Sequence, residues 1–206
     1  MVGVVRRAPL FSKIVDTLSP VSGFAASALK SIGVEAVGRY LENLSDSERD
    51  VLFQAGLGIL PLSKAPTSPL NADFGRSHAK FLLQRAMMLE VPTGVHLMVD
   101  LEAQSGTHTD VLAYDEALTN EIALSGYVPL AYVGQPQPLS AQQLFQLPDV
   151  HLYWRGGSSN IPEPACSFAL WQIPPLDQVL VAGLRVDMSV AGEDLRGRPP
   201  MLWYPT

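Results

Sequence analysis

Two carboxylic acids stand one residue apart in the middle of the chain, directly after an apolar run. Residues 94–106 read GVHLMVDLEAQSG, so Asp100 and Glu102 follow a segment that suits a buried strand. Side chains two apart on an extended strand point to the same face. By itself the pair has two interpretations: a cap for the next segment, or paired acids that donate and accept protons during a reaction.

Further candidates stand at the ends of other predicted strands. Asp16 ends the first strand and Asp187 ends the eighth. The remaining polar and aromatic candidates are Arg39, Tyr40, Lys64, Tyr132, Trp154, Arg155, Trp171 and Gln172. Crowded acids push their pKa values apart, which keeps one of them protonated near neutral pH. Aromatic rings fit the apolar faces of sugars. These residue types favour glycoside cleavage, in which one carboxylic acid protonates the leaving oxygen and another carboxylate acts as base, nucleophile or stabiliser.

Each acid alone has a simpler explanation, because an Asp at a strand end often caps the following helix. An Asp-x-Glu pair is also common by chance, and Trp171 alone suits a core. The joint placement is what favours a site. Capping does not require acids at the ends of the first, fourth and eighth strands, and no clear helix follows the eighth.

Alternating strand-like and helix-like segments must position these side chains. Periodicity and capping residues predict helices over 23–33, 45–56, 75–90, 109–126 and 140–147, with Ser45 and Glu48 as a capping box. Strand-like runs occupy 11–16, 34–40, 57–62, 94–100, 127–134, 150–156, 167–173 and 184–188. This pattern predicts an α/β fold, an irregular TIM-like (β/α) barrel with five βα units and then three strands with little helix. Active sites of such barrels form at the C-terminal ends of the strands.

Composition argues against several other classes of protein. The 206 residues suit one domain over 1–206, with a core from about 12 to 190. The net charge of −6 and the lack of a basic cluster disfavour nucleic-acid binding. Cys166 is the single cysteine, and the four histidines are scattered, so we expect neither a metal nor another cofactor. No run approaches 18 apolar residues, so no membrane span is expected.

The chain resembles a known family. Its segments KIVDT, ALKSIGVEAVGRYL, FQAGLGILPL, GRSHAKFLLQRAMMLEVPTGVHLMVDLE, SGYVPLAYVG, FALWQI and LRVDM are similar to those of the glycoside-hydrolase-like domain family of unknown function. Members of that family are barrels related to the family 25 muramidases, the lysozymes that cut the glycan chain of peptidoglycan. The resemblance extends from about residue 12 to 190. It is most specific over 23–41, over 75–102, and in the late Trp-Gln followed by Val-Asp.

The resemblance implies roles for the four acids. Muramidases carry an Asp on the first strand, an Asp-x-Glu on the fourth and an Asp on the eighth, and Asp16, Asp100, Glu102 and Asp187 take these places. Glu102 would be the general acid, and Asp100 would orient the substrate N-acetyl group or assist the base. Asp16 and Asp187 would shape the electrostatics of the site. The expected substrate contacts are Tyr40, Arg39, Tyr132, Trp154, Trp171 and Gln172.

The resulting hypothesis is a hydrolase that acts on peptidoglycan, with this polysaccharide as its partner. Two alternatives stay open, a catalytically inactive glycan-binding module and a structural module on the same barrel. The N-terminal MVGVVRRAPLFSKIVDT lacks the order of segments in a cleavable signal peptide. We therefore expect synthesis in the cytoplasm. Delivery to the periplasm or cell wall would then need a route without such a leader, with a secretion or immunity partner.

Overall fold

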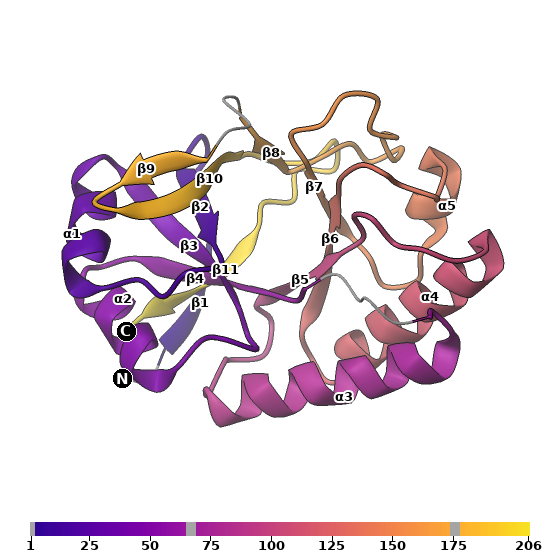
Figure 1. Ribbon diagram of the computed structural model, residues 1–206, viewed down its shortest axis with the longest axis horizontal. Helices are drawn as coiled ribbons and strands as arrows, with labels where there is room; N and C mark the ends of the chain where they lie inside the picture. The colour runs from indigo at the N-terminus through magenta and orange to yellow at the C-terminus, as the bar shows by residue number, and fades with distance from the viewer. Residues whose placement is uncertain (1–2, 65–68, 174–177) are drawn as a thin grey trace.

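A closed barrel of eight strands forms the centre of the computed structural model, which describes residues 3–64, 69–173 and 178–206. Around the ring, each strand pairs with the next and the last returns to the first (Figure 1). The strands are β2 (Lys13–Thr17), β3 (Val34–Tyr40), β4 (Gly58–Leu62), β5 (His96–Asp100), β6 (Val128–Val133), β7 (Leu152–Arg155), β8 (Leu170–Gln172) and β10 (Leu184–Ala191). The predicted TIM-like barrel is thus confirmed.

Helices follow the first five barrel strands, as the sequence predicts, and lie outside the barrel (Figure 1). They are α1 (Gly23–Ser31), α2 (Asp46–Gln54), α3 (Ala72–Met88), α4 (His108–Leu124) and α5 (Ala141–Gln146). Each begins after a Ser, Asn or Thr whose side chain accepts a backbone N–H of the first turn. The predicted capping box of α2 is only half formed. Ser45 accepts the N–H of Glu48, whereas the Glu48 carboxylate turns away to bind Arg39 and the N–H of Val21.

The last barrel strand runs against its neighbours. β2 through β8 pair in parallel around the ring, whereas β10 pairs antiparallel with both β2 and β8. A parallel return would need a crossover of a dozen or more residues. Here β9 (Val179–Val181) instead turns directly into β10 as a hairpin. This corrects the expectation that Asp187 ends its strand, because Asp187 lies within β10 and reaches the rim owing to the reversed direction.

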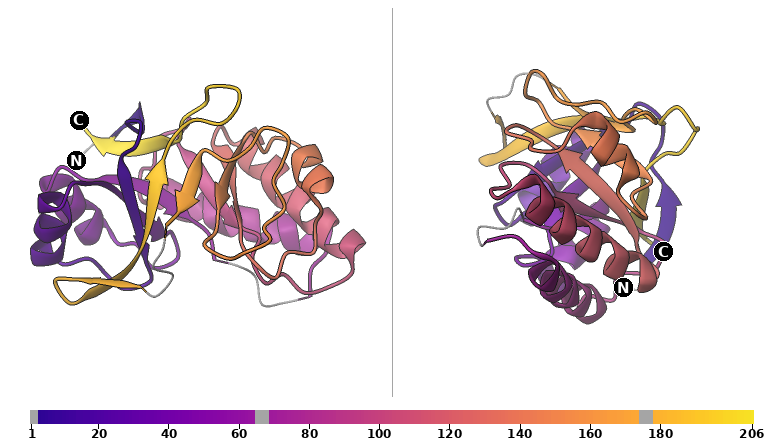
Figure 2. Two further views of the ribbon diagram at one scale, coloured as in Figure 1. Left: turned by 90° about the horizontal axis from the view of Figure 1, so that it is seen from above. Right: turned by 90° about the vertical axis from the view of Figure 1, so that its right-hand side faces the viewer.

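The two ends of the chain form strands that the sequence analysis did not predict. β1 (Gly3–Arg7) pairs antiparallel with β11 (Met201–Pro205), and Figures 1 and 2 show the termini close together. Trp203 of β11 pairs with Ile59 near the start of β4. The N–H of Met201 donates to Nδ1 of His96, at the start of β5, over 2.6 Å. The chain ends therefore lie at the end of the barrel opposite the C-terminal rim of the parallel strands.

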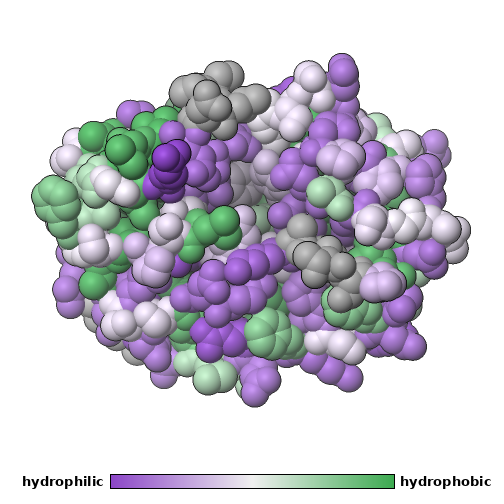
Figure 3. Space-filling view, in the orientation of Figure 1, coloured by the Kyte–Doolittle hydropathy of each residue, from purple (hydrophilic) through white to green (hydrophobic). Residues whose placement is uncertain are grey.

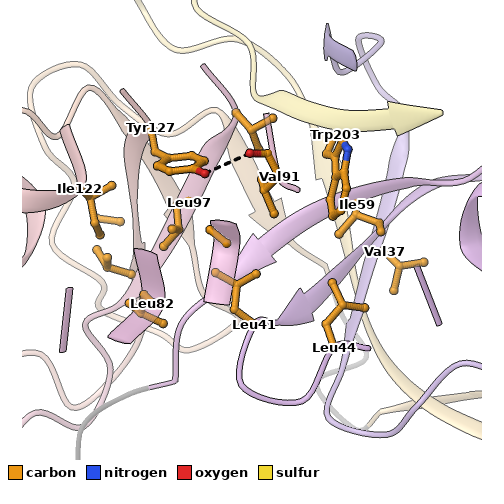
Figure 4. Packing of buried hydrophobic residues seen from close by; sticks show 14 of the residues in the cluster. Val37, Leu41, Leu44, Ile59, Leu82, Val91, Leu97, Ile122, Tyr127 and Trp203 are labelled. Atoms are coloured by element: carbon orange, nitrogen blue, oxygen red, sulfur yellow. Dashed lines mark hydrogen bonds between the residues drawn. The ribbon is translucent and has the colours of Figure 1, made fainter. Parts of the chain in front are cut away.

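Alternation along the strands divides the apolar residues into two cores. One lies inside the barrel and includes Ile14, Leu60, Met98 and Leu152. The other lies between the strands and the helices, and Figure 4 shows its packing around Val37, Leu82, Leu97, Ile122 and Trp203. Within the described ranges, no helix is both long enough and apolar enough to cross a membrane.

Candidate active site

Four carboxylates line one cavity of about 110 Å³ at the C-terminal rim of the barrel. Asp16 comes from β2, Asp100 from the last position of β5, and Asp187 from β10. Glu102 comes from the turn that follows β5. Hydrophilic residues gather around the hollow near the middle of the face in Figure 3. The four acids that the sequence singled out are thus brought to one place.

Asp16 and Asp187 are brought together by strand pairing. They are direct partners in the register between β2 and β10. On the other side of Asp16, its partner on β3 is Gly38. A Cβ atom on Gly38 would come within 2.9 Å of the Asp16 Cβ atom. The missing side chain at Gly38 therefore leaves the space that Asp16 occupies.

Asp100 both shapes the turn after β5 and lines the cavity. Its Oδ1 accepts the backbone N–H of Glu102 over 2.9 Å. The same turn is fixed to β6 and its following loop, because the N–H groups of Leu101 and Ala103 donate to the carbonyls of Tyr132 and Pro136. Asp100 therefore caps a turn, as one of the two interpretations of the acid pair expects, and it also faces the cavity.

The side chain of Glu102 packs against the loop after β6. A Cβ atom on Gly134 would lie 2.4 Å from Glu102 Oε1, so this glycine makes room for the carboxylate. Burial raises the pKa of Glu102, and the nearby charge of Asp187 adds to the increase. A hydrogen bond from the backbone of Gln135 acts in the opposite direction. A raised pKa suits a group that must carry a proton to a substrate.

Asp16 is the second acid of the cavity whose pKa is raised. Burial raises its pKa well above the usual range, and the charges of Asp187 and Asp100 raise it further. Burial likewise raises the pKa values of Tyr40 and Tyr132, with contributions from the surrounding carboxylates. Both tyrosines are therefore neutral hydroxyls at physiological pH. The cavity thus combines raised-pKa acids with uncharged hydrogen-bonding groups.

The rest of the cavity wall comes from Tyr40, Met98, Tyr132, Trp154 and Gln172. The Tyr132 hydroxyl donates to Oε1 of Gln172 over 2.8 Å. Trp154 packs edge-on against Tyr132, with ring centroids 5.3 Å apart, and its Nε1 donates to Oγ of Ser189. Because Trp154 is only 1% exposed, it forms part of the floor rather than an open stacking surface.

Two of the predicted substrate contacts lie elsewhere. Arg39 is on the outer face of β3, fully buried, and binds Glu48 at 2.7 Å and the carbonyl of Thr17. Trp171 faces away from the barrel interior and packs against the core between strands and helices. Each was assigned to the rim beside a neighbour, Tyr40 or Gln172. Adjacent residues on a strand point to opposite faces, so only one of each pair can line the cavity.

Three site residues escaped the sequence analysis because they are glycines. Gly38 and Gly134 make room for two of the acids, and a Cβ atom on Gly156 would come within 2.8 Å of the Tyr132 hydroxyl. Glycine inside a strand often marks the close approach of another group. Gly38, in the middle of the strand-like run VEAVGRY, carried that signal.

A buried polar pair anchors the loop that carries Glu102. Gln104 Nε2 donates to Oδ1 of Asp115 on α4 over 2.7 Å. Burial raises the pKa of Asp115 to about 7. Among the described residues, Asp115 Oδ2 and Gln104 Oε1 are buried without a hydrogen-bond partner. Both atoms can only accept hydrogen bonds while Asp115 is ionised. A proton on Asp115 Oδ2 makes that atom a hydrogen-bond donor.

Within 3–64, 69–173 and 178–206, no group of three His, Cys, Asp or Glu side chains is placed to hold a metal ion.

Comparison with solved structures shows which proteins share this fold. An uncharacterized protein from B. stearothermophilus superposes with a TM-score of 0.69 and 18% identity, covering 87% of this chain and 95% of that one. The Tat-secreted protein Rv2525c of Mycobacterium tuberculosis gives 0.67 and 16%, with coverages of 88% and 95%. The muramidase of Trichobolus zukalii gives 0.63 and 16%, with coverages of 90% and 95%. At these identities the likeness shows the fold alone.

Sequence comparison identifies the family directly. No curated protein matches the chain significantly. The profile of the family described as "Rv2525c-like, glycoside hydrolase-like domain" matches residues 27–174. Since this range covers well over half of the 206 residues, the chain belongs to the Rv2525c-like family of glycoside hydrolase-like domains.

Proposed function

We propose that the protein is a glycoside hydrolase that cleaves the glycan strands of peptidoglycan in the manner of a muramidase. The observation that carries this proposal is the convergence of Asp16, Asp100, Glu102 and Asp187 on one small cavity. Glycoside hydrolysis needs a carboxylic acid that is still protonated and a carboxylate that is ionised, and crowding several acids together supplies both forms.

Glu102 is the proposed general acid. Its pKa is raised, and Gly134 leaves its carboxyl group the room it occupies beside the cavity. In the reaction Glu102 gives its proton to the glycosidic oxygen as the C1–O bond breaks. Positive charge then develops at C1 and the ring oxygen, where an ionised carboxylate stabilises it. Water completes the hydrolysis by adding its hydroxyl to C1 and returning a proton to the carboxylates.

The other acids take supporting roles in this proposal. Asp100 is held in place by the N–H of Glu102 and contacts the substrate N-acetyl group or assists the base. Asp187 and Asp16 set the local potential of the site. The charge of Asp187 raises the pKa values of Glu102 and Asp16, and the charge of Asp100 also raises that of Asp16. Removing Asp187 should therefore change the pH profile of turnover as well as its rate, because its charge raises the pKa of Glu102.

The choice of peptidoglycan rests on the relatives. A muramidase shares the fold over 90% of this chain. The Rv2525c protein, which shares it over 88%, is described as Tat-secreted, and this supports a place of action outside the cytoplasm. Fractionation of the producing cells that recovers the protein in the cytosol alone would contradict this location.

The test is release of reducing ends from purified peptidoglycan of several cell-wall types. Wild type should release them, and Glu102→Gln should lower the rate by at least about a hundredfold, the usual contribution of a general acid. Glu193→Gln, which neutralises an exposed acid in the loop after β10, is the matched control and should retain full activity. No release by the wild type on any wall sinks the proposal. Sugar binding that survives Glu102→Gln without turnover would identify a non-catalytic glycan-binding module.

A further inference from the structure

The carboxamide of Gln172 is held in one orientation by the protein. Its Oε1 accepts the Tyr132 hydroxyl over 2.8 Å and the backbone N–H of Gly157 over 3.1 Å. A backbone N–H can only donate, so the atom that faces Gly157 must be the carboxamide oxygen. This fixes the position of the amide nitrogen, Nε2, on the other side of the group.

Nε2 is the end of Gln172 that remains for a ligand. The side chain lines the cavity, and no hydrogen bond from Nε2 to the described residues is formed. The other N–H and O–H donors of Tyr132 and Trp154 are already used, on Gln172 and on Ser189. Among the described residues that line this acceptor-rich cavity, the side-chain donors that remain are thus Gln172 Nε2, the Tyr40 hydroxyl and any protonated acid.

We propose that Gln172 determines specificity for N-acylated 2-amino sugars by donating from Nε2 to the carbonyl oxygen of the N-acyl group. This inference rests on the proposed function and assigns a substrate feature to one atom of the site. An N-acyl group presents a carbonyl acceptor and an N–H donor. The fixed amide of Gln172 matches the first, and the carboxylates that line the same cavity match the second.

The experiment compares chitotriose with cellotriose, which differ only in the acetamido or hydroxyl group at C2. Affinities are measured by calorimetry for wild type and Gln172→Glu. Glu keeps an oxygen for Tyr132 and Gly157 but has no N–H to donate. The affinity for chitotriose should fall by at least about tenfold, the usual cost of a lost hydrogen bond in a site. The affinity for cellotriose should change little, so the preference for chitotriose disappears.

Matched variants separate this role from charge and stability. Gln142→Glu adds the same charge at an exposed position of α5 and should keep the preference. If Gln172→Glu does not fold, Gln172→Met, which adds no charge, is compared in the same way. Tyr132→Phe removes one of the two donors that orient the Gln172 amide. It should weaken the preference for chitotriose less than either Gln172→Glu or Gln172→Met does.

The outcomes distinguish this inference from the proposed function. If the wild type cleaves peptidoglycan while the Gln172 variants keep an unchanged preference for chitotriose, the role of Gln172 is overturned and the hydrolase stands. If the wild type neither binds chitotriose nor cleaves peptidoglycan, both fail. A preference that is lost in the Gln172 variants but kept in Gln142→Glu supports the assignment.

Discussion

Asp16 and Asp187 face each other across the seam where the first and last strands of the barrel meet. They are register partners of β2 and β10, although most of the chain lies between them in sequence. The pKa of Asp16 is raised by burial and by Asp187, so the pairing costs folding energy when both groups ionise. Closure of the barrel therefore brings the two acids of the site together, and their mutual repulsion lowers the stability of the closed barrel.

Asp16→Asn should therefore stabilise the protein. A carboxyl whose folded-state pKa is raised stabilises the fold fully only below its unfolded pKa, and that contribution is lost as the pH rises through the folded value. Removing the group should raise the free energy of unfolding at pH 8, while turnover falls. Urea unfolding measures this. Asp73→Asn, at a side chain that is 91% exposed, should change little. If Asp16→Asn is less stable than the wild type, favourable interactions of the Asp16 carboxylate in the folded protein outweigh the cost of burying it.

The Gln104–Asp115 pair makes stability depend on pH in a window set by Asp115. The pKa of Asp115 is about 7 in the fold, raised by burial, with Glu116 on the same helix adding to the increase. The folded state therefore holds a proton that the unfolded state releases near pH 4, so stability falls as the pH rises from about 4 to about 7 and is level above that. At about 1.4 kcal/mol per pKa unit, the total is on the order of 4 kcal/mol.

Asp115→Asn isolates this contribution from other titrating groups. An amide at position 115 can both donate to and accept from the Gln104 carboxamide at any pH. The difference in unfolding free energy between variant and wild type should therefore grow from pH 4 to pH 7, measured by denaturant titration. Glu116→Gln, at the exposed neighbour, should leave most of the slope intact. A difference that does not vary with pH would show that Asp115 titrates at its ordinary value.

Gly134→Ala should impair the reaction without unfolding the protein. The added methyl group would lie 2.4 Å from Glu102 Oε1, so the carboxylate must move. A displaced general acid should cost at least about tenfold in kcat. Gly23→Ala places the same methyl group where no atom lies within 4 Å and is the matched control. Unchanged kcat in Gly134→Ala would indicate that Glu102 does not act from its position in this structure.

Arg39→Met tests the corrected role of this arginine. Its loss would leave the carboxylate of Glu48 buried with only the N–H of Val21 as partner. We expect a destabilisation of about 3–5 kcal/mol, as for other broken buried ion pairs. Arg39→Met combined with Glu48→Gln should recover part of it. Arg76→Met, which breaks an exposed pair with Asp73, should cost less than about 1 kcal/mol. Weaker substrate binding at unchanged stability would return Arg39 to the site.

Residue patterns were sufficient for the regular part of the barrel. Capping residues and apolar periodicity marked the five helices, and the acids at strand ends marked the rim, because both signals are local. The sequence did not decide which of two adjacent residues at a strand end points into the barrel. Arg39 and Tyr40 could each have faced inward, and only the register of β3 with β2 and β4 decides between them.

The parts that sequence could not supply depend on contacts between distant segments. The reversed direction of β10 follows from its hairpin with β9, and no residue of LRVDM by itself indicates direction. β1 and β11 are short strands whose partners lie at the far end of the chain. The glycines of the site matter because Asp16, Glu102 and Tyr132 occupy the space that their side chains would take. This role can be recognised only once the positions of those three residues are known.

The pairing of β1 with β11 has a consequence for how this barrel can be joined to other proteins. Both ends of the chain lie side by side at the end of the barrel away from the carboxylates. A fusion partner attached at either end would be held clear of the rim. The same proximity should make the chain tolerant of circular permutation. A short linker would join residues at the two present ends, and the new termini would be placed in an exposed loop beside a helix.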